Sequence, residues 1–120
     1  MKTILVADDS SFMRRAVKDM LADAYEVVEA GSGAQSLEQF ERARPDLTLL
    51  DVVLPEGDEE GLRVLRRMIG EDPAAKVVMM TGLDERDAVV AECLRSGAKG
   101  CVVKPFAKER LREAVAQFLG

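Results

Sequence analysis

The sequence predicts an α/β fold in which a parallel sheet carries helices on both faces, a doubly wound arrangement. Five short apolar runs alternate with five longer stretches whose apolar residues recur at helical spacing. Four of the runs are nearly continuous in apolar character, as is typical of strands covered on both faces. The 120 residues, 48% hydrophobic and 32% charged, suit one globular domain over residues 1–120.

The first unit pairs the apolar run 3–7 with an expected helix that carries apolar residues from Phe12 to Leu21. The apolar residues of this helix recur at i, i+1, i+4 and i+5, which places them on one face. They are Phe12, Met13, Ala16, Val17, Met20 and Leu21.

The second and third units follow the same pattern. Run 25–30 precedes an expected helix over 33–44, where Ser32 and Gln35 have the spacing of a capping box. Pro45 ends this helix because proline disfavours helical backbone at the residue before it. Run 47–50 is the third strand, and the helix after it carries Leu62, Leu65, Met68 and Ile69 on one face.

The last two units complete the sheet. Runs 76–80 and 100–103 are the fourth and fifth strands, and helices are expected over 84–96 and around 111–119. Gly70 and Gly97 stand where a glycine at a helix C-terminus is expected.

Polar residues follow four of the expected strands, and ligands of such sheets bind outside the carboxyl ends of the strands. These residues are Asp8, Asp9, Asp51, Thr81 and Lys104, with Pro105 behind the lysine. Three aspartates carry −3, which Mg²⁺ and Lys104 together neutralise, and Mg²⁺ commonly takes carboxylate ligands. We therefore predict a Mg²⁺ site that stabilises the fold when filled. Taken singly, each residue also fits an ordinary role, such as a helix cap at Asp9 or Ser10.

Composition excludes several other classes of protein. The net charge of −5 argues against nucleic acid or an anionic membrane as the direct partner. The chain has no histidine, which removes most hydrolase and zinc-enzyme readings. The apolar stretch at the N-terminus is too short for a signal peptide, no window approaches a membrane span, and two cysteines make no disulfide framework. A cytoplasmic location is expected.

Four segments carry a resemblance to a known family. They are "VADDSSFMRR", "LTLLDVVLP", "VVMMTG" and "VVKPF". They resemble the receiver domain of two-component response regulators, and the end of the chain after the fifth helix resembles the single-domain chemotaxis type. The resemblance implies a flavodoxin-like (βα)5 sandwich with strand order 2-1-3-4-5. It also implies a phosphoacceptor regulatory domain, not an enzyme, that assists its own phosphorylation and slow dephosphorylation.

Carried over to this sequence, the resemblance makes Asp51 the acceptor of a phosphoryl group from a partner histidine kinase or phosphotransfer protein. Asp9 and Asp51 would bind Mg²⁺ directly, Asp8 through a water, and Val53 through its backbone carbonyl.

The resemblance also assigns roles near the ends of the last two strands. Lys104 and Thr81 would hold phosphoryl oxygens, and Gly82 would leave them room. The Lys104–Pro105 peptide bond would be cis. Movement of Thr81 would repack the face formed by the fourth helix, fifth strand and fifth helix, and so change affinity for a downstream protein target.

Three positions depart from the family pattern. Cys101 replaces the aromatic residue that usually follows the threonine inward. The segment "LPEGDEEGL" is about two residues longer than usual, and we interpret its four acids as a solvated turn leading into a helix. Val53 and Leu83 stand where family members that lose phosphate quickly place polar groups, so we expect a long-lived phosphoryl state.

Other functions stay open beside this one. The first is a receiver-like protein-interaction module that works without phosphorylation, which Cys101 favours. A phosphatase forming an aspartyl phosphate would need a carboxylate at Val53, and a flavin phosphate would be repelled by "ADDSS". A docking surface is expected on helices 84–96 and 107–119, with Arg86, Arg95, Lys108, Arg110 and Arg112.

Overall fold

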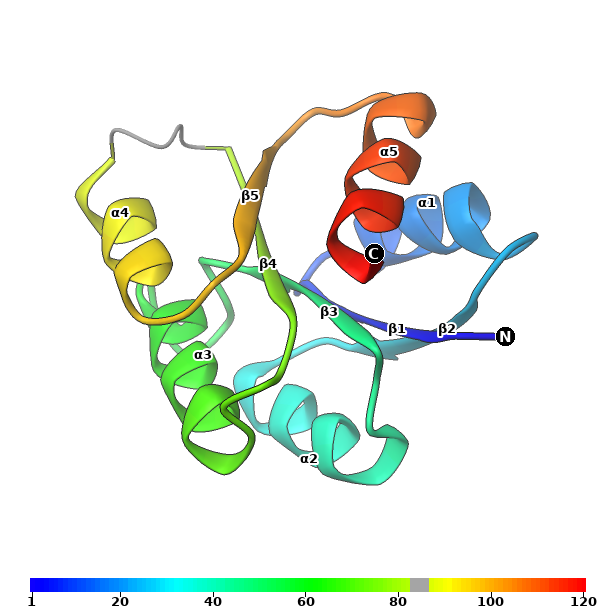
Figure 1. Ribbon diagram of the computed structural model, residues 1–120. Coiled ribbons are helices and arrows are strands. Elements are labelled where there is room, and N and C mark those ends of the chain that lie inside the picture. Colours follow the sequence, from blue (N-terminus) through cyan, green and yellow to red (C-terminus); the bar gives the residue numbers. More distant parts are fainter. Residues whose placement is uncertain (83–86) are drawn as a thin grey trace.

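The computed structural model describes residues 1–82 and 87–120, which form alternating strands and helices (Figure 1). The strands are β1 (Thr3–Ala7), β2 (Glu26–Ala30), β3 (Leu47–Asp51), β4 (Val77–Thr81) and β5 (Gly100–Val103). The helices are α1 (Ser11–Leu21), α2 (Gly33–Ala43), α3 (Glu60–Glu71), α4 (Ala88–Arg95) and α5 (Lys108–Leu119). The beginning of the helix expected at 84 lies outside the described residues.

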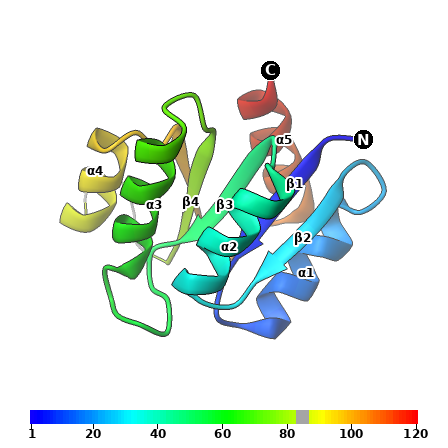
Figure 2. The same cartoon turned by 90° about the horizontal axis from the view of Figure 1, so that it is seen from below.

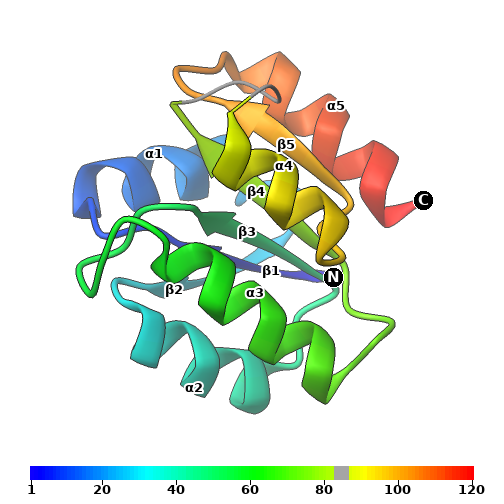
Figure 3. The same cartoon turned by 90° about the vertical axis from the view of Figure 1, so that its left-hand side faces the viewer.

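All strand pairs are parallel, and the sheet has the order β2-β1-β3-β4-β5. Figure 2 shows α2, α3 and α4 on one face of this sheet and α1 and α5 on the other. In Figure 3, α3 and α4 lie side by side. The predicted doubly wound α/β fold and its strand order are confirmed.

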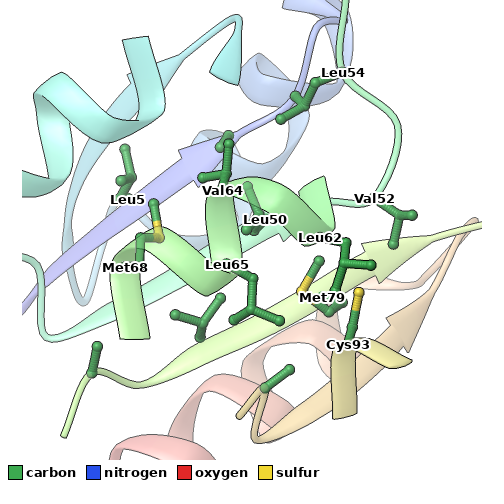
Figure 4. Close-up of a cluster of buried hydrophobic side chains, with 14 of the residues drawn as sticks. Leu5, Leu50, Val52, Leu54, Leu62, Val64, Leu65, Met68, Met79 and Cys93 are labelled. Atoms are coloured by element: carbon green, nitrogen blue, oxygen red, sulfur yellow. The ribbon is translucent and has the colours of Figure 1, made fainter. Parts of the chain in front are cut away.

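The central strands are buried on both faces, and their alternate residues supply two separate cores. Leu5 of β1 points into the core beneath α2, α3 and α4, whereas its neighbours Ile4 and Val6 point into the core beneath α1 and α5. Figure 4 shows the first of these cores, where Leu5, Leu50 and Met79 come from three strands and Leu65 and Met68 from α3. Continuous apolar runs therefore serve two faces at once.

The start of α2 follows the expected capping pattern in part. The Ser32 hydroxyl accepts the Gln35 backbone N–H at 3.1 Å, but the Gln35 side chain accepts from Gly31 and not from Ser32. The helix ends at Ala43, since Arg44 takes left-handed backbone with φ of 45° before Pro45.

Two expectations about helices were wrong in detail. Gly70 does not end a helix: it lies inside α3, whose C-cap is Asp72, whereas Gly97 follows α4 with φ of 116° as expected. Phe12 does not face the core, and 81% of it is exposed. Phe12 lies five positions before the buried Val17, which turns Phe12 about 140° away around the helix axis.

In the described part of the chain, no helix is both long and apolar enough to cross a membrane.

Candidate functional site

The register of the sheet brings the predicted residues to one edge. Ala7 pairs with Leu50, so Asp8 and Asp51 are the next residues along neighbouring strands. Thr81 ends β4 opposite Val103 of β5, and Lys104 follows directly. The structure thus places Asp8, Asp51, Thr81 and Lys104 together at the carboxyl edge, with Asp9 beside them.

Three carboxylates form the centre of this site. One oxygen from each of Asp8, Asp9 and Asp51 lies within 4.8 Å of the others. Asp8 and Asp51 are buried, and Asp9 is exposed at the rim. Like charges this close repel one another, and removing two of them from water adds to the cost unless other groups bind them.

Asp8 is bound through every polar group that it has. Its N–H donates to the carbonyl of Ala30 at 3.0 Å, and its carbonyl accepts from Arg14 Nη1 at 2.6 Å. Its carboxylate accepts the Ser10 N–H at 2.9 Å through Oδ1 and Lys104 Nζ at 2.6 Å through Oδ2. Ser10 also caps α1 by accepting the Met13 N–H, so this turn is fixed from both sides.

Lys104 joins two acids that lie far from it in the sequence. Its ammonium group donates to Asp8 Oδ2 at 2.6 Å and to Asp51 Oδ2 at 2.9 Å. Its backbone N–H donates to the carbonyl of Thr81 at 2.7 Å, which holds the ends of β4 and β5 together. The Lys104–Pro105 peptide bond is cis.

Burial and charge act in opposite directions on the two central groups. Burial raises the pKa of the Asp51 carboxyl, and the Lys104 ammonium offsets only part of this effect. For Lys104, burial alone would lower the pKa, but the hydrogen bonds to Asp8 and Asp51 outweigh it and the pKa is raised. Lys104 therefore stays charged, and the Asp51 carboxylate carries its charge at a cost.

The donor set fits a hard divalent cation. Lys104 contributes +1 against −3 from Asp8, Asp9 and Asp51, so the cluster keeps −2 when all are ionised. Both carboxylate oxygens of Asp8 and both of Asp51 accept hydrogen bonds from protein groups, and Asp9 is exposed at the rim of the cluster. Carboxylate oxygens of this kind suit Mg²⁺.

The remaining predicted residues surround these charges. Thr81 is buried, and Gly82 next to it is exposed. The Val53 N–H donates to Asp51 Oδ1 at 3.2 Å, while 45% of Val53 is exposed to solvent. Val53 therefore does not form a closed cover over the site, and Leu83 lies outside the described residues.

Cys101 lies at the centre of β5, opposite Met79 of β4, and is partly buried against the core that contains Cys93. Burial raises the pKa of Cys93 to about 11, so that thiol stays protonated.

The loop between β3 and α3 differs from the predicted solvated turn. The Glu56 carboxylate accepts the N–H groups of Gly33 at 2.9 Å and Ala34 at 3.1 Å, which caps α2 and lowers the pKa of Glu56. Glu60 is buried, is paired with Arg63, and lies directly against Gly33. Two of the four acids thus tie this loop to another helix, while Asp58 and Glu59 are exposed as expected.

The proposed basic docking surface is only partly free. Arg95 pairs with Glu92 at 2.9 Å, and Arg112 pairs with Asp23 at 2.6 Å. Lys108 and Arg110 are exposed in the first turn of α5, and Arg86 lies outside the described residues.

Two residues of the site were not predicted from the sequence. Arg14 binds the Asp8 carbonyl, and nothing in the sequence distinguished it from Arg15 beside it. Gly61 packs its backbone against Asp51 and Val52, with its N–H donating to the Val52 carbonyl at 2.9 Å. A glycine in the first turn of an expected helix, where it lowers helix propensity, is a signal that would have identified Gly61.

Comparisons with known proteins agree with this geometry. The family described as response regulator receiver domain matches residues 4–116. A chemotaxis protein CheY of Listeria monocytogenes is 37% identical over 117 residues, which is 96% of each chain. Sporulation initiation phosphotransferase F of Bacillus subtilis is 33% identical over 97% of this chain and 92% of its own. A solved CheY-like receiver domain from Methanospirillum hungatei superposes with a TM-score of 0.90 at 29% identity, covering 99% of this chain and 94% of that one.

Proposed function

Because this chain belongs to the family of response regulator receiver domains, we propose that it is a signalling domain that accepts a phosphoryl group on Asp51. The observation that carries the proposal is the bridge from Lys104 to the buried carboxylates of Asp8 and Asp51. This cluster keeps a charge of −2, so a bound divalent cation would balance it and would leave that ion and Lys104 beside an incoming anionic phosphoryl group. The domain extends over residues 1–120, and the donor is a histidine kinase or phosphotransfer protein.

Phosphoryl transfer needs a nucleophile and a leaving group that are in line. A carboxylate oxygen of Asp51 attacks the phosphorus of a phosphohistidine, and the phosphorus–nitrogen bond breaks. The electron pair of that bond stays on the imidazole nitrogen, which then takes up a proton. The raised pKa of Asp51 makes its carboxylate a better nucleophile than an exposed one.

The chain's own groups receive the transferred charge. Lys104, already 2.9 Å from Asp51, holds one phosphoryl oxygen as a compact positive charge. The Thr81 hydroxyl, buried at the end of β4, donates to a second oxygen. Gly82 adds no side chain beside it.

Asp9 and Asp51 would hold Mg²⁺, with Asp8 acting through a water and Val53 through its carbonyl. The bound ion would neutralise the negative charge of the phosphoryl oxygens during transfer. Asp8 orients the site by keeping Lys104 in place.

The output is a change in protein binding. Thr81 joins the phosphoryl group to the end of β4, which pairs with β5 and so reaches α4 and α5. Phosphorylation shifts the population of this face toward a state that binds a downstream target. Cys101 takes part as a small partly buried side chain in place of a ring. A cytoplasmic location, with no direct contact to nucleic acid or membrane, accompanies this role.

A second candidate is an interaction module that binds partners without phosphorylation. Cys101 favours it, because a thiol is too small to transmit the position of Thr81 as an aromatic ring would.

Mass spectrometry after incubation with Mg²⁺ and acetyl phosphate separates the two. We expect the protein to gain the mass of one phosphoryl group, and Asp51→Asn to gain none. Asp19→Asn, an exposed aspartate on α1, is the matched control and should behave like the wild type. No gain in the wild-type protein would favour the interaction module.

A further inference from the structure

Arg14 lies on α1, and its side chain contacts the backbone of the acidic cluster. Its Nη1 donates to the Asp8 carbonyl at 2.6 Å, and its Nε donates to Glu29 Oε1 at 3.2 Å. Only 19% of its side chain is exposed, compared with 80% for Arg15, whose Nε is 3.9 Å from the exposed Asp19. The two neighbouring arginines therefore differ in both burial and contacts: Arg14 binds the site, and Arg15 lies in solvent.

The first turn of α1 and the end of β2 together fix the position of Arg14. Its backbone N–H is bound to the Ser10 carbonyl at 3.0 Å, at the first turn of α1. Glu29 of β2 accepts from Nε of the guanidinium, whereas the Asp8 carbonyl accepts from Nη1. A Cβ on Gly31 would lie 3.1 Å from Arg14 Nη1, so the glycine leaves room for the guanidinium beside the end of β2.

The position of the Asp8 carbonyl affects the backbone of Asp9. It belongs to the peptide group that joins Asp8 to Asp9, and a peptide group is planar. A hydrogen bond that holds the Asp8 carbonyl oxygen therefore also holds the plane of this peptide group, which includes the backbone nitrogen of Asp9. The Asp8 carboxylate has two further anchors, in Ser10 and Lys104, whereas Asp9 stands exposed at the rim.

We infer that Arg14 is a positioning residue that directs the Asp9 carboxylate toward the metal position by fixing the Asp8–Asp9 peptide. The inference rests on the proposed function, since it concerns the same site. Glu29 neutralises the guanidinium, so the contribution of Arg14 is one of orientation more than of charge. Groups that orient metal ligands commonly change metal affinity by about 10-fold to 100-fold when removed.

A purely structural role makes a different prediction. If Arg14 only fastened α1 to β2, its removal would lower the free energy of unfolding and leave the affinity for Mg²⁺ unchanged. The two quantities are measured independently, by urea unfolding in EDTA and by isothermal titration calorimetry with Mg²⁺.

The experiment compares Arg14→Met, Arg14→Lys and the control Arg15→Met with the wild type. Methionine keeps an apolar stem and removes the donors, so we expect binding of Mg²⁺ to weaken about tenfold or more. Lysine reaches the Asp8 carbonyl or Glu29 but lacks the fork that reaches both, so a smaller loss is expected. Arg15→Met should bind Mg²⁺ as the wild type does.

Two outcomes would be decisive against the inference. A folded Arg14→Met protein with wild-type affinity for Mg²⁺ would overturn it and leave the proposed function standing. Wild-type protein that binds no Mg²⁺ would overturn the proposed function and the inference together. If Arg14→Met does not fold, the same comparison is made with Arg14→Lys, and an unchanged affinity there overturns the inference.

Discussion

At the scale of single residues, the site is short of positive charge. Lys104 is the ammonium group that both Asp8 and Asp51 bind, and Asp9 adds a third negative charge close by. Buried carboxylates are tolerated only when they are paired and hydrogen-bonded, and one cation cannot neutralise three. The metal-free protein therefore gives up stability to keep this arrangement.

The first prediction concerns the charge on Asp51. Its pKa is raised in the folded protein, so the folded state binds this proton more tightly than the unfolded state does. The stabilising contribution is present below the ordinary value of 3.8 and is lost as the pH rises through the raised folded value. In EDTA at neutral pH, Asp51→Asn should therefore be more stable than the wild type, with an advantage that shrinks toward about pH 4.

Urea unfolding at both pH values measures this difference. Asp19→Asn, whose carboxylate is exposed, should show no comparable gain at neutral pH. A less stable Asp51→Asn protein at neutral pH would mean that the bond to Lys104 outweighs burial.

The second prediction concerns Val53, two residues beyond Asp51, the proposed acceptor. An apolar side chain there cannot orient an attacking water, although 45% of Val53 is exposed and it covers the site incompletely. Val53→Asn should shorten the half-life of phosphorylated Asp51, measured as loss of the phosphoryl mass over time. Val53→Leu should not, and an unchanged half-life in Val53→Asn would count against the expected long-lived state.

At the scale of elements, α3 starts in direct contact with the end of β3. The Gly61 N–H binds the Val52 carbonyl at 2.9 Å, and a Cβ on Gly61 would lie 2.6 Å from Val52 Cα and collide with the Asp51 carbonyl. Backbone atoms cannot yield as a flexible side chain does. The close approach of α3 to β3 therefore depends on glycine at this position.

The third prediction compares two glycines of the same helix. Gly61→Ala should destabilise the protein by about 3 kcal/mol, because a methyl group is forced against backbone. Gly70 has open space around its Cβ position, so Gly70→Ala should stabilise the helix by about 0.5–1 kcal/mol. Urea unfolding measures both changes, and similar effects at the two positions would contradict the account.

At the scale of the whole molecule, the site exists only in the folded chain. Asp8 and Lys104 are 96 residues apart, and the sheet brings them within 2.6 Å. An ion that needs this geometry binds the folded state and not the unfolded one, so it stabilises the fold by mass action.

The fourth prediction is therefore a thermal shift with Mg²⁺. At 100 times its Kd, the ion should stabilise the protein by about 2.7 kcal/mol and raise the Tm, which differential scanning calorimetry measures. Asp9→Asn should lose most of this shift. Sodium chloride at matched ionic strength is the control, and an equal shift with it would show that screening of the acids, not binding, is responsible.

Much of the fold was predictable, because the signals for it are local. The apolar runs located all five strands to within a residue, since the central strands are buried on both faces and consist mostly of apolar residues. The site residues followed from the same reasoning, as the carboxyl ends of parallel strands share one edge. Their chemical roles stay predictions that the experiments above address.

The errors had two sources, the direction of a residue around its helix and a partner that is distant in the sequence. Phe12 shares the apolar character of its neighbours, yet the angle around α1 leaves it in solvent. From the sequence, Glu56 is predicted to be a solvated loop acid. Its carboxylate instead caps α2 by accepting the N–H groups of Gly33 and Ala34, which are 23 and 22 residues away. No pattern within the loop indicates that contact.

By itself, the sequence determined the order of strands and helices, the residues at the strand ends and the family, because periodicity and motifs are properties of neighbouring residues. The tertiary structure alone decided that Lys104 binds both Asp8 and Asp51, that Arg14 holds the Asp8 carbonyl, and that Gly61 admits α3 against β3. Such contacts depend on how the helices pack on the sheet. The distances between packed elements cannot be deduced from the spacing of residues along the chain.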